Sequence, residues 1–329
     1  MATRHFCTFF DKNYLSRGLA LYESLRAHAG DFRWYVLCLD DEAHRYLSER
    51  ALPEVVLVKR SELEAADPAL AATRPTRSLV EYYFTITPAW VCYVLATYDL
   101  DIVTYVDADF RFFSSPEPLF TELGDKSVGV VEHRFPPARA HLEKWGRFNV
   151  GWLSFRNDEQ GKACAAWWRE RCIEWCYDRI EGDKFADQKY LEQWPRLFSQ
   201  LAILQHKGVS VAPWNLEPEK LRIDAGRTMI DDQPLICFHY HGFKHVVGPL
   251  YETGLRAFGL RLDDTLRTAL FAPYLTELLS HEARLARAGI TKGHAKTLRL
   301  RNGGLGDLRR RATNAVGAIV KRTGLWART

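Results

Sequence analysis

The sequence has no uninterrupted apolar run of about 18 residues, which is the length that a helix needs to cross a lipid bilayer. It also contains no internal repeat and no low-complexity stretch. The segment 1–10 has neither a basic start nor a long apolar core, so it does not resemble a secretory leader. These features argue against a membrane-spanning, repetitive or exported chain, and we expect a globular protein of the cytoplasm.

Cysteine is sparse and odd in number, with 7 residues scattered through apolar stretches. This pattern does not match the disulfide framework of a small secreted domain, and it favours a reducing compartment. Cys164, Cys172 and Cys176 could share one face of a helix, which raises the alternative of a zinc site. Their spacing matches no common zinc motif, and the neighbouring tryptophans favour a buried apolar face.

The chain has 329 residues, of which 47% are hydrophobic and 26% are charged, as is typical of a globular protein. A fold of this length buries about 75% of the surface of the unfolded chain, so it needs neither disulfides nor a structural metal. The net charge of +4 is uneven, because residues 281–329 contain twelve Lys and Arg against two acidic residues, which leaves −6 for residues 1–280. A mildly acidic body is not expected to bind nucleic acid.

Apolar runs alternate with helical patterns over the first third of the chain. Strands are predicted at 5–10, 34–39, 55–58 and 101–106, with helices between them. This alternation is typical of an α/β fold with a Rossmann-like, mostly parallel sheet flanked by helices. The same patterns predict further strands at 128–131, 152–155, 201–204, 209–212 and 235–238, and further helices at 79–98, 159–177, 186–194 and 262–279.

Two carboxylates, Asp107 and Asp109, directly follow the buried strand predicted at 101–106. Open α/β folds place their ligands at the carboxyl ends of parallel strands. Two neighbouring carboxylates repel each other unless a cation bridges them, and their hard oxygens suit magnesium or manganese, which in turn neutralises a diphosphate. The motif alone fits both a metal site and a solvated acidic turn.

Six short segments give this pair a context because they occur in one order between residues 5 and 245: Asp11-Lys12-Asn13-Tyr14, Tyr22-Glu23-Ser24-Leu25, Tyr105-Val106-Asp107-Ala108-Asp109, Phe148-Asn149-Val150-Gly151, Asp187-Gln188 and His239-Tyr240-His241-Gly242. In this order the chain resembles the GT-A fold nucleotide-diphospho-sugar glycosyltransferases. Within them it is similar to the retaining glycogenin and bacterial lipopolysaccharide galactosyltransferase family. The specificity comes from the ordered set, since each segment alone is a weak motif.

The resemblance implies a divalent metal, manganese or magnesium, held by Asp107, Asp109 and His239. Neutral imidazole joins two carboxylates readily on manganese, and a diphosphate completes the coordination. His241 is the competing choice for the third ligand. Alternatively, His241 packs in the core or only supports the ligands.

The resemblance also implies which residues contact the donor. The nucleotide would be bound by the end of the first strand and the turn after it, that is by Thr8, Phe9, Phe10, Asp11 and Tyr14. Asp107 would contact it as well. Asn149 and Gly151 would lie beside the donor sugar. Catalysis beside the anomeric carbon would fall to Asp187 and Gln188.

The source of positive charge for the diphosphate is less regular. The resemblance places Gly242 and Lys244 at the diphosphate, but the lysine that the family carries three residues after this glycine is replaced by His245, and Lys244 lies one position early. Arg74 and Arg77 could also reach a diphosphate, because guanidinium suits phosphate oxygens. Solvated loop charges are the alternative interpretation of these two arginines.

The resemblance predicts a metal-dependent hexosyltransferase that moves a sugar from a nucleotide-diphosphate donor, preferably a UDP-sugar, to a glycan or lipid-linked glycan in cell-surface polysaccharide synthesis. Retention is favoured over inversion, for which Asp187 or Glu132 could serve as the general base. A haloacid-dehalogenase-like phosphohydrolase would need Thr or Val where Arg111 stands, and a sugar nucleotidyltransferase would need a glycine-rich loop, but residues 7–17 contain no glycine. A nucleotide-sugar-binding GT-A module without activity is the non-enzymatic alternative.

The charge pattern divides the chain into a GT-A domain at 1–280 and a basic tail at 281–329. Within the domain, about 1–110 would be the nucleotide-binding half and 111–280 the acceptor half. The tail has an amphipathic helical pattern whose apolar side consists of Leu305, Leu308, Ala312, Ala315, Val316, Ile319 and Val320. Such a helix can lie on an anionic membrane surface as a peripheral anchor, and a helix packed on the body is the alternative.

Overall fold

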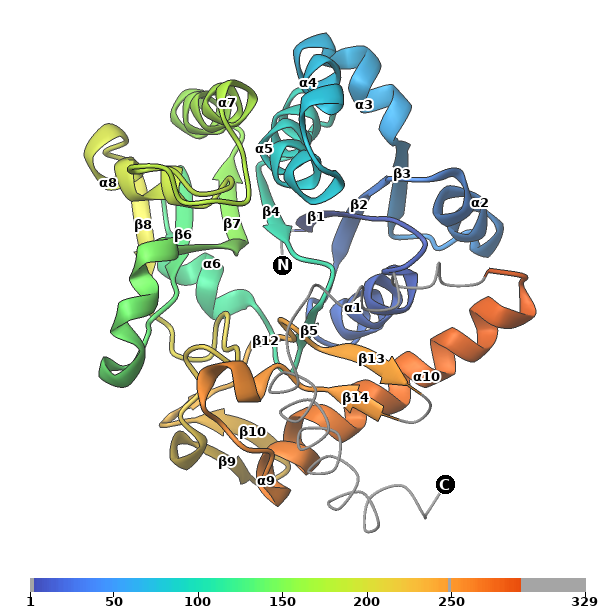
Figure 1. Cartoon of the computed structure of the whole chain (residues 1–329), viewed down its shortest axis with the longest axis vertical. Helices are drawn as coiled ribbons and strands as arrows, with labels where there is room; N and C mark the ends of the chain where they lie inside the picture. Colours follow the sequence, from blue (N-terminus) through green and yellow to red (C-terminus); the bar gives the residue numbers. More distant parts are fainter. Residues whose placement is uncertain (1–2, 248–249, 291–329) are drawn as a thin grey trace, which may run out of the picture.

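Seven strands form the central sheet of the computed structural model, which describes residues 3–247 and 250–290. Their order is β3-β2-β1-β4-β7-β6-β8 (Figure 1). The strands are β1 Arg4–Phe10, β2 Phe32–Cys38, β3 Val55–Lys59, β4 Ile102–Val106, β6 Val128–Glu132, β7 Phe148–Arg156 and β8 Leu201–Leu204. Neighbours pair in parallel except for β7, which is antiparallel to β4 and β6. The predicted α/β fold with a mostly parallel sheet is confirmed.

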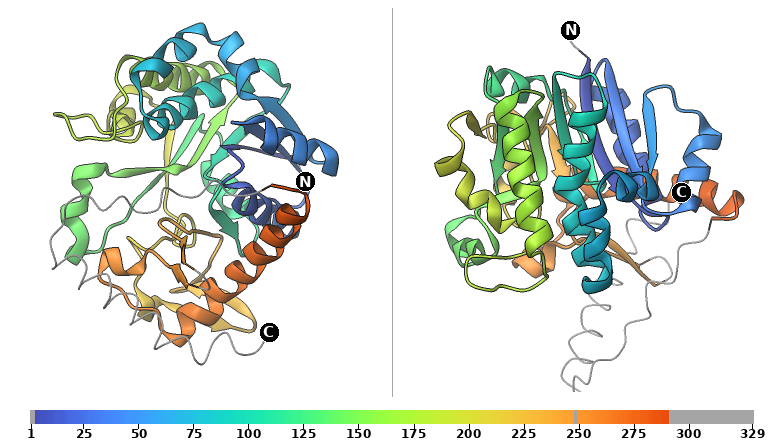
Figure 2. Two further views of the ribbon diagram at one scale, coloured as in Figure 1. Left: turned by 45° about the vertical axis from the view of Figure 1, so that its right-hand side comes forward. Right: turned by 90° about the horizontal axis from the view of Figure 1, so that it is seen from above.

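Helices cover both faces of this sheet. On one face α5 Leu79–Thr97 and α7 Glu159–Glu174 lie side by side (Figure 2), next to α3 Arg60–Ala66 and α4 Pro68–Thr73. On the other face lie α1 Leu15–His28, α2 Asp41–Arg50 and α6 Glu117–Leu123. Each face of the sheet buries one large apolar cluster against its helices. The sheet is therefore covered on both sides, which is why its central strands read as continuous apolar runs.

Helix α5 is long and apolar enough to cross a membrane when judged by length and composition alone. In the fold it is a core helix, because Ile86, Trp90 and Val94 are buried and it packs against α7. Its start is fixed by a capping box, in which the Ser78 hydroxyl accepts from the Glu81 amide and the Glu81 carboxylate accepts from the Ser78 amide. The composition of α5 thus reflects burial inside the protein.

The cysteines of the described chain are free thiols. Cys164, Cys172 and Cys176 are fully buried in the apolar cluster that α5 and α7 share. The prediction of a buried apolar face, rather than a zinc site, agrees with this packing.

After β8, the described chain passes the end of β4 and then packs beside α1. A three-stranded sheet is formed by β9 Leu221–Asp224, β10 Arg227–Ile230 and β11 Gln233–Pro234, and a hairpin by β13 Lys244–Val247 and β14 Leu250–Glu252. Between them, β12 Cys237–His239 pairs with β5 Phe110–Phe112, just beyond the end of β4. Helix α10 Ala272–Arg287 packs against α1 (Figure 1). This path brings the segment around His239 to the end of β4.

The remaining elements are short: α8 Trp194–Leu197, α9 Asp264–Leu266, the 3-10 segments Arg74–Thr76, Pro137–Trp145, Lys189–Gln193, Pro218–Lys220 and Leu255–Phe258, and a π turn at Arg267–Phe271. The strand predicted at 209–212 is wrong, because only a single bridge joins Val211 to Phe238. The helix predicted at 262–279 is divided by the π turn.

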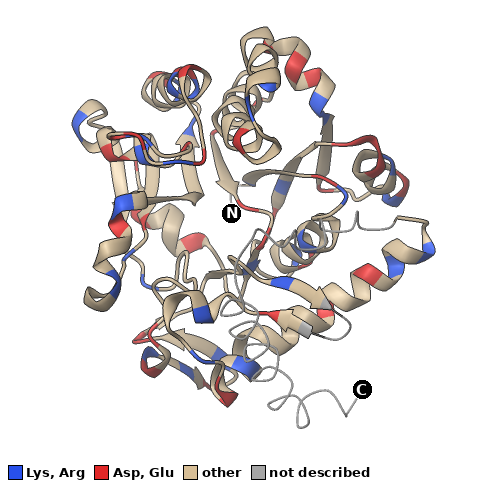
Figure 3. Ribbon diagram, in the orientation of Figure 1, with Lys and Arg blue, Asp and Glu red and all other residues tan. Residues whose placement is uncertain are grey.

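The predicted boundary between residues 280 and 281 falls inside α10. The division into a domain and a tail stays a prediction. The apolar stripe predicted in the tail lies outside the described residues. Within the described part of the chain, acidic and basic residues are interspersed over the helices and strands (Figure 3).

Candidate active site

Three side chains that can bind a metal converge just beyond the end of β4. Asp107 and Asp109 follow that strand, and the pairing of β12 with β5 places His239 opposite Phe110. The Nε2 atom of His239 lies 3.1 Å from Oδ1 of Asp109 and 3.7 Å from Oδ2 of Asp107. One ligand atom from each of the three residues lies within 4.8 Å of the others. The three residues that the resemblance groups as metal ligands are therefore neighbours in space.

The charges in this group depend on each other. Burial, together with the charge of Asp109, raises the pKa of Asp107 against the opposing charge of His239. Burial would raise the pKa of Asp109 as well, but the charge of His239, helped by Arg17, lowers it to about 2. Burial would lower the pKa of His239, but the two aspartates raise it. The His239 imidazole and the Asp109 carboxylate thus favour each other's charged forms.

This group fits a divalent cation. Two carboxylate oxygens and an imidazole nitrogen form a donor set that suits manganese, and magnesium accepts the two oxygens. A cation in the group would supply the positive charge that the His239 proton otherwise provides, leaving a neutral imidazole to coordinate. Three protein ligands leave coordination positions for phosphate oxygens.

His241 lies farther from the aspartates than His239 does. Its ring centroid is 5.7 Å from that of His239, and both rings meet the edge or face of Trp214. The group of three ligand atoms contains His239 and does not contain His241. This placement favours His239 as the third ligand, in line with the preference from the sequence.

The aspartates are held by the strands beside them. The Tyr105 hydroxyl donates to Oδ1 of Asp107 at 2.8 Å, and the Asp107 amide donates to the Gly151 carbonyl at 3.3 Å. Asn149 accepts from the Gly151 amide at 2.9 Å and from the Ser210 hydroxyl at 3.3 Å. These bonds connect the predicted sugar-binding segment of β7 directly to the metal group.

Gly151 is packed too tightly for any side chain. A Cβ atom at this position would lie 2.7 Å from Oδ1 of Asn149, 2.8 Å from the Phe110 ring and 2.9 Å from Oδ2 of Asp107. Real Cβ atoms essentially never make contacts this short. A side chain at this position would therefore force its neighbours to move, and one of them, Asp107, is a candidate metal ligand.

Asp187 and Gln188 lie in the segment between α7 and the 3-10 turn Lys189–Gln193. Burial, with a contribution from the charge of Asp107, raises the pKa of Asp187 to about 7 against a hydrogen bond from Thr87. The Gln188 side chain donates to the Trp145 carbonyl at 3.0 Å, which connects this segment to the 3-10 turn before β7. The predicted catalytic pair thus lies near enough to the metal group for Asp107 to influence Asp187.

The residues predicted to bind the nucleotide divide into two sets. Thr8 and Phe10 are buried, and Phe10 packs on Trp34, so only their backbone can contact a ligand. Phe9 lies on the other side of β1, 6.0 Å from the Tyr105 ring between centroids. Asp11 and Tyr14, just after β1, complete the set that lies toward the metal group. Burial, together with the charge of Asp109, raises the pKa of Tyr14.

The basic residues considered for the diphosphate are occupied by other partners. Lys244 pairs with Glu252 at 3.0 Å on the hairpin of β13 and β14. Gly242 lies in the turn just after β12 with a φ of +75°. Arg74 pairs with Glu64 at 3.5 Å. The Arg77 guanidinium stacks on Tyr177 at 3.9 Å and donates to the Ile173 carbonyl.

Sequence reasoning gave no role to three residues of this region. Tyr105 holds Asp107, and His133 contacts the Asn149 amide through Nε2 at 3.1 Å. Arg17 donates to the Phe243 carbonyl at 2.7 Å, next to the turn that carries His241. The period of two in β4 placed Tyr105 and Asp107 on one side of the strand, which was an available signal. The other two contacts join segments far apart in the sequence.

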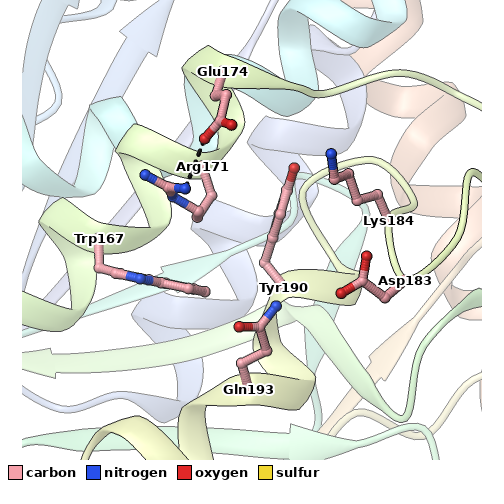
Figure 4. A pocket seen from close by; sticks show the side chains of 7 residues that line it. All are labelled: Trp167, Arg171, Glu174, Asp183, Lys184, Tyr190 and Gln193. Atoms are coloured by element: carbon pink, nitrogen blue, oxygen red, sulfur yellow. Dashed lines mark ion pairs between the residues drawn. The ribbon is translucent and has the colours of Figure 1, made fainter.

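A separate pocket of about 240 Å³ lies on α7 and the segment after it (Figure 4). None of the metal group lines it; its lining residues are Trp167, Arg171, Glu174, Asp183, Lys184, Tyr190 and Gln193. Arg171 and Glu174 pair with each other at 2.7 Å, so these two charges already compensate one another. The candidate active site is thus defined by the converging side chains beyond β4 and not by this pocket.

Comparisons with other proteins support a common architecture. No protein-family model matches the chain. The chain is 30% identical over 282 residues to the uncharacterized protein YfnD of Bacillus subtilis (strain 168), an alignment that covers 84% of this chain and 89% of YfnD. It is 32% identical over 253 residues to the uncharacterized protein YfnF of the same organism, covering 74% of this chain and 83% of YfnF.

Among solved structures, the galactosyltransferase LgtC, crystallised with donor and acceptor sugar analogues, superposes with a TM-score of 0.52 at 18% identity. The superposition covers 84% of this chain and 95% of LgtC. At this identity the likeness concerns the fold. The chain therefore belongs to the family of YfnD and YfnF, and its fold is that of the GT-A glycosyltransferases.

Proposed function

We propose that this protein is a metal-dependent glycosyltransferase that moves a sugar from a nucleoside-diphosphate donor, preferably a UDP-sugar, to a hydroxyl of a glycan or lipid-linked glycan. The observation that carries the proposal is the convergence of Asp107, Asp109 and His239 beyond β4 in a GT-A fold. The same fold gives no support to the alternative of a haloacid-dehalogenase-like phosphohydrolase.

In this reaction the anomeric carbon leaves an oxygen of the diphosphate and bonds to the acceptor oxygen. The nucleoside diphosphate departs with the electron pair of the broken bond, and its leaving oxygen takes up the proton that the acceptor hydroxyl loses. When bound, a divalent cation, manganese or magnesium, neutralises the diphosphate. Asp107, Asp109 and His239 would hold that cation, and Tyr105 orients Asp107.

Asp187 and Gln188 are proposed to act at the anomeric carbon. A buried carboxylate with a pKa of about 7 is ionised above neutral pH, where it can stabilise positive charge as the glycosidic bond breaks. We favour retention of configuration because this pair matches the retaining family that the sequence resembles. Phe9, Asp11 and Tyr14 are proposed to contact the nucleotide, and Asn149 and Gly151 the donor sugar. If the acceptor is a lipid-linked glycan of cell-surface polysaccharide synthesis, the basic segment 281–329 would bind the anionic cytoplasmic face of the membrane.

The proposal is tested with the full-length protein and a panel of UDP-, GDP- and dTDP-sugars, by measuring release of the nucleoside diphosphate with manganese, with magnesium and with EDTA. We expect release from at least one UDP-sugar, loss of this release in EDTA, and recovery when manganese is added back. Proton NMR of the sugar product then reads the anomeric configuration. If no sugar nucleotide is bound or cleaved under any of these conditions, the proposed function is wrong.

A second experiment concerns the proposed reaction centre. Asp187→Asn and Gln188→Ala are each expected to lower kcat by about 10- to 100-fold, because these groups act on the transition state. Affinity for UDP measured by calorimetry should change by less than about 2-fold, since neither group contacts the nucleotide. Asp183→Asn, an exposed carboxylate on the same segment, is the matched control and should keep full activity. Unchanged kcat in both variants would move the reaction centre elsewhere.

A further inference from the structure

Arg17 lies in the first turns of α1, and its guanidinium reaches the turn that follows β12. One nitrogen, Nη2, donates to the Phe243 carbonyl at 2.7 Å. The guanidinium carbon lies 4.4 Å from the centre of the Tyr14 ring, one of the rings that face the metal group. Phe243 follows Tyr240, and the Tyr240 amide donates to the Asp109 carbonyl at 2.9 Å. These contacts place a permanent positive charge beside the candidate metal site.

This positive charge has no carboxylate partner. Within residues 3–247 and 250–290, Arg17 forms no ion pair, and its Nε atom is buried without a hydrogen-bond partner. A buried donor that is left unpaired costs about 1–3 kcal/mol, so such a group is normally satisfied by a partner or a ligand. The arginine therefore has hydrogen-bonding capacity that the described protein does not use.

The other basic residues considered for the diphosphate are engaged with other partners. Lys244 is paired with Glu252 and its side chain is 63% exposed, and Arg74 and Arg77 are engaged with Glu64 and Tyr177. The lysine that the resembled family carries after Gly242 is a histidine in this chain. Arg17 differs from them because it combines an unpartnered Nε with a hydrogen bond to the turn beside the metal group. Guanidinium presents several N–H groups in one plane, which suits phosphate oxygens.

We propose that Arg17 binds the diphosphate of the donor and supplies the positive charge that the missing lysine would otherwise provide. This inference rests on the proposed function, since it requires a nucleoside diphosphate at the metal group. Arg17 then has two roles: Nη2 holds the turn at Phe243, and the remaining N–H groups bind phosphate oxygens. A residue that only held the turn would affect every ligand of the site equally, whereas a phosphate-binding residue discriminates by phosphate content.

Calorimetry of the full-length protein with UDP, UMP and uridine, each in the presence of manganese, separates these roles. Arg17→Gln is expected to weaken UDP binding by about 10- to 100-fold, as for loss of a hydrogen bond to a charged group. Uridine affinity and the affinity for manganese alone should change by less than about 2-fold. Arg17→Lys, which keeps the charge, should fall between wild type and Arg17→Gln. Arg26→Gln, on the same helix and paired with Glu23 and Glu54, is the matched control and should bind UDP normally.

Thermal unfolding of each variant verifies that it is folded. If Arg17→Gln binds UDP as wild type does, or loses UDP and uridine affinity equally, the inference is wrong and the proposed function stands. If the wild type binds none of UDP, GDP and dTDP with manganese, the proposed function and the inference both fail.

Discussion

Asp109→Asn is expected to abolish turnover while the protein remains folded. The substitution replaces one carboxylate of the metal group by a neutral amide of the same size, and Oδ1 of Asp109 is the atom closest to Nε2 of His239. Loss of a residue that only supports a ligand typically costs about 10- to 100-fold in metal affinity or activity, so loss of a ligand should exceed about 100-fold. Release of nucleoside diphosphate from the preferred sugar nucleotide at saturating manganese measures the effect.

The fold should tolerate this change. Removing one buried charge-assisted hydrogen bond costs about 1.5–3 kcal/mol, which is less than the usual total stability of about 5–15 kcal/mol. Asp125→Asn, an exposed carboxylate in the turn after α6, is the matched control and should leave activity unchanged. Activity of Asp109→Asn equal to wild type at saturating manganese would remove the basis of the proposed function.

Gly151→Ala is expected to damage the metal group although it replaces none of the candidate metal ligands. The added methyl group would lie 2.9 Å from Oδ2 of Asp107 and 2.7 Å from Oδ1 of Asn149, so both side chains must move. We expect manganese affinity to fall by more than about 100-fold, since a ligand and its neighbour are displaced together. Overpacking should also lower the free energy of unfolding by about 1–3 kcal/mol. Manganese titration by calorimetry and urea denaturation measure the two effects.

Gly129→Ala separates damage to the site from damage to the sheet. Gly129 lies on the neighbouring strand β6, where an added Cβ would lie 3.1 Å from a Leu123 methyl and 3.3 Å from the Ser154 Cβ, away from the metal group. We expect this control to lose some stability but to bind manganese normally. If Gly151→Ala and Gly129→Ala have the same manganese affinity, Gly151 has no special role at the site.

The sequence predicted the parts of the fold that depend on buried central strands. Strand β4 and the carboxylates after it were recognisable because a strand covered on both faces reads as one apolar run. The same signal failed at residues 209–212, where Val209 and Val211 are buried but the segment forms a single bridge. An apolar pattern reports burial, and it does not report whether a backbone pairs with a neighbouring strand.

The helix predicted at 262–279 is interrupted for another reason. Pro273 has no amide hydrogen to donate, and the π turn Arg267–Phe271 separates α9 from the regular helix that begins at Ala272. Within β1, the sequence could not say which side chains face the site, since both faces of a central strand are apolar, and Phe9 and Phe10 differ only by their position in the pleat. Arg17 escaped notice because its contact with Phe243 depends on the path of the chain after β8.

The pairing of β12 with β5 has a consequence for how the protein is made. Asp107 and Asp109 leave the ribosome well before His239, and the strand that carries His239 must cross to β5 before the three ligands meet. A nascent chain that ends before His239 therefore carries two of the three candidate metal ligands. Under the proposed function, a product that terminates before His239 would lack the third metal ligand and is expected to leave sugar nucleotides uncleaved.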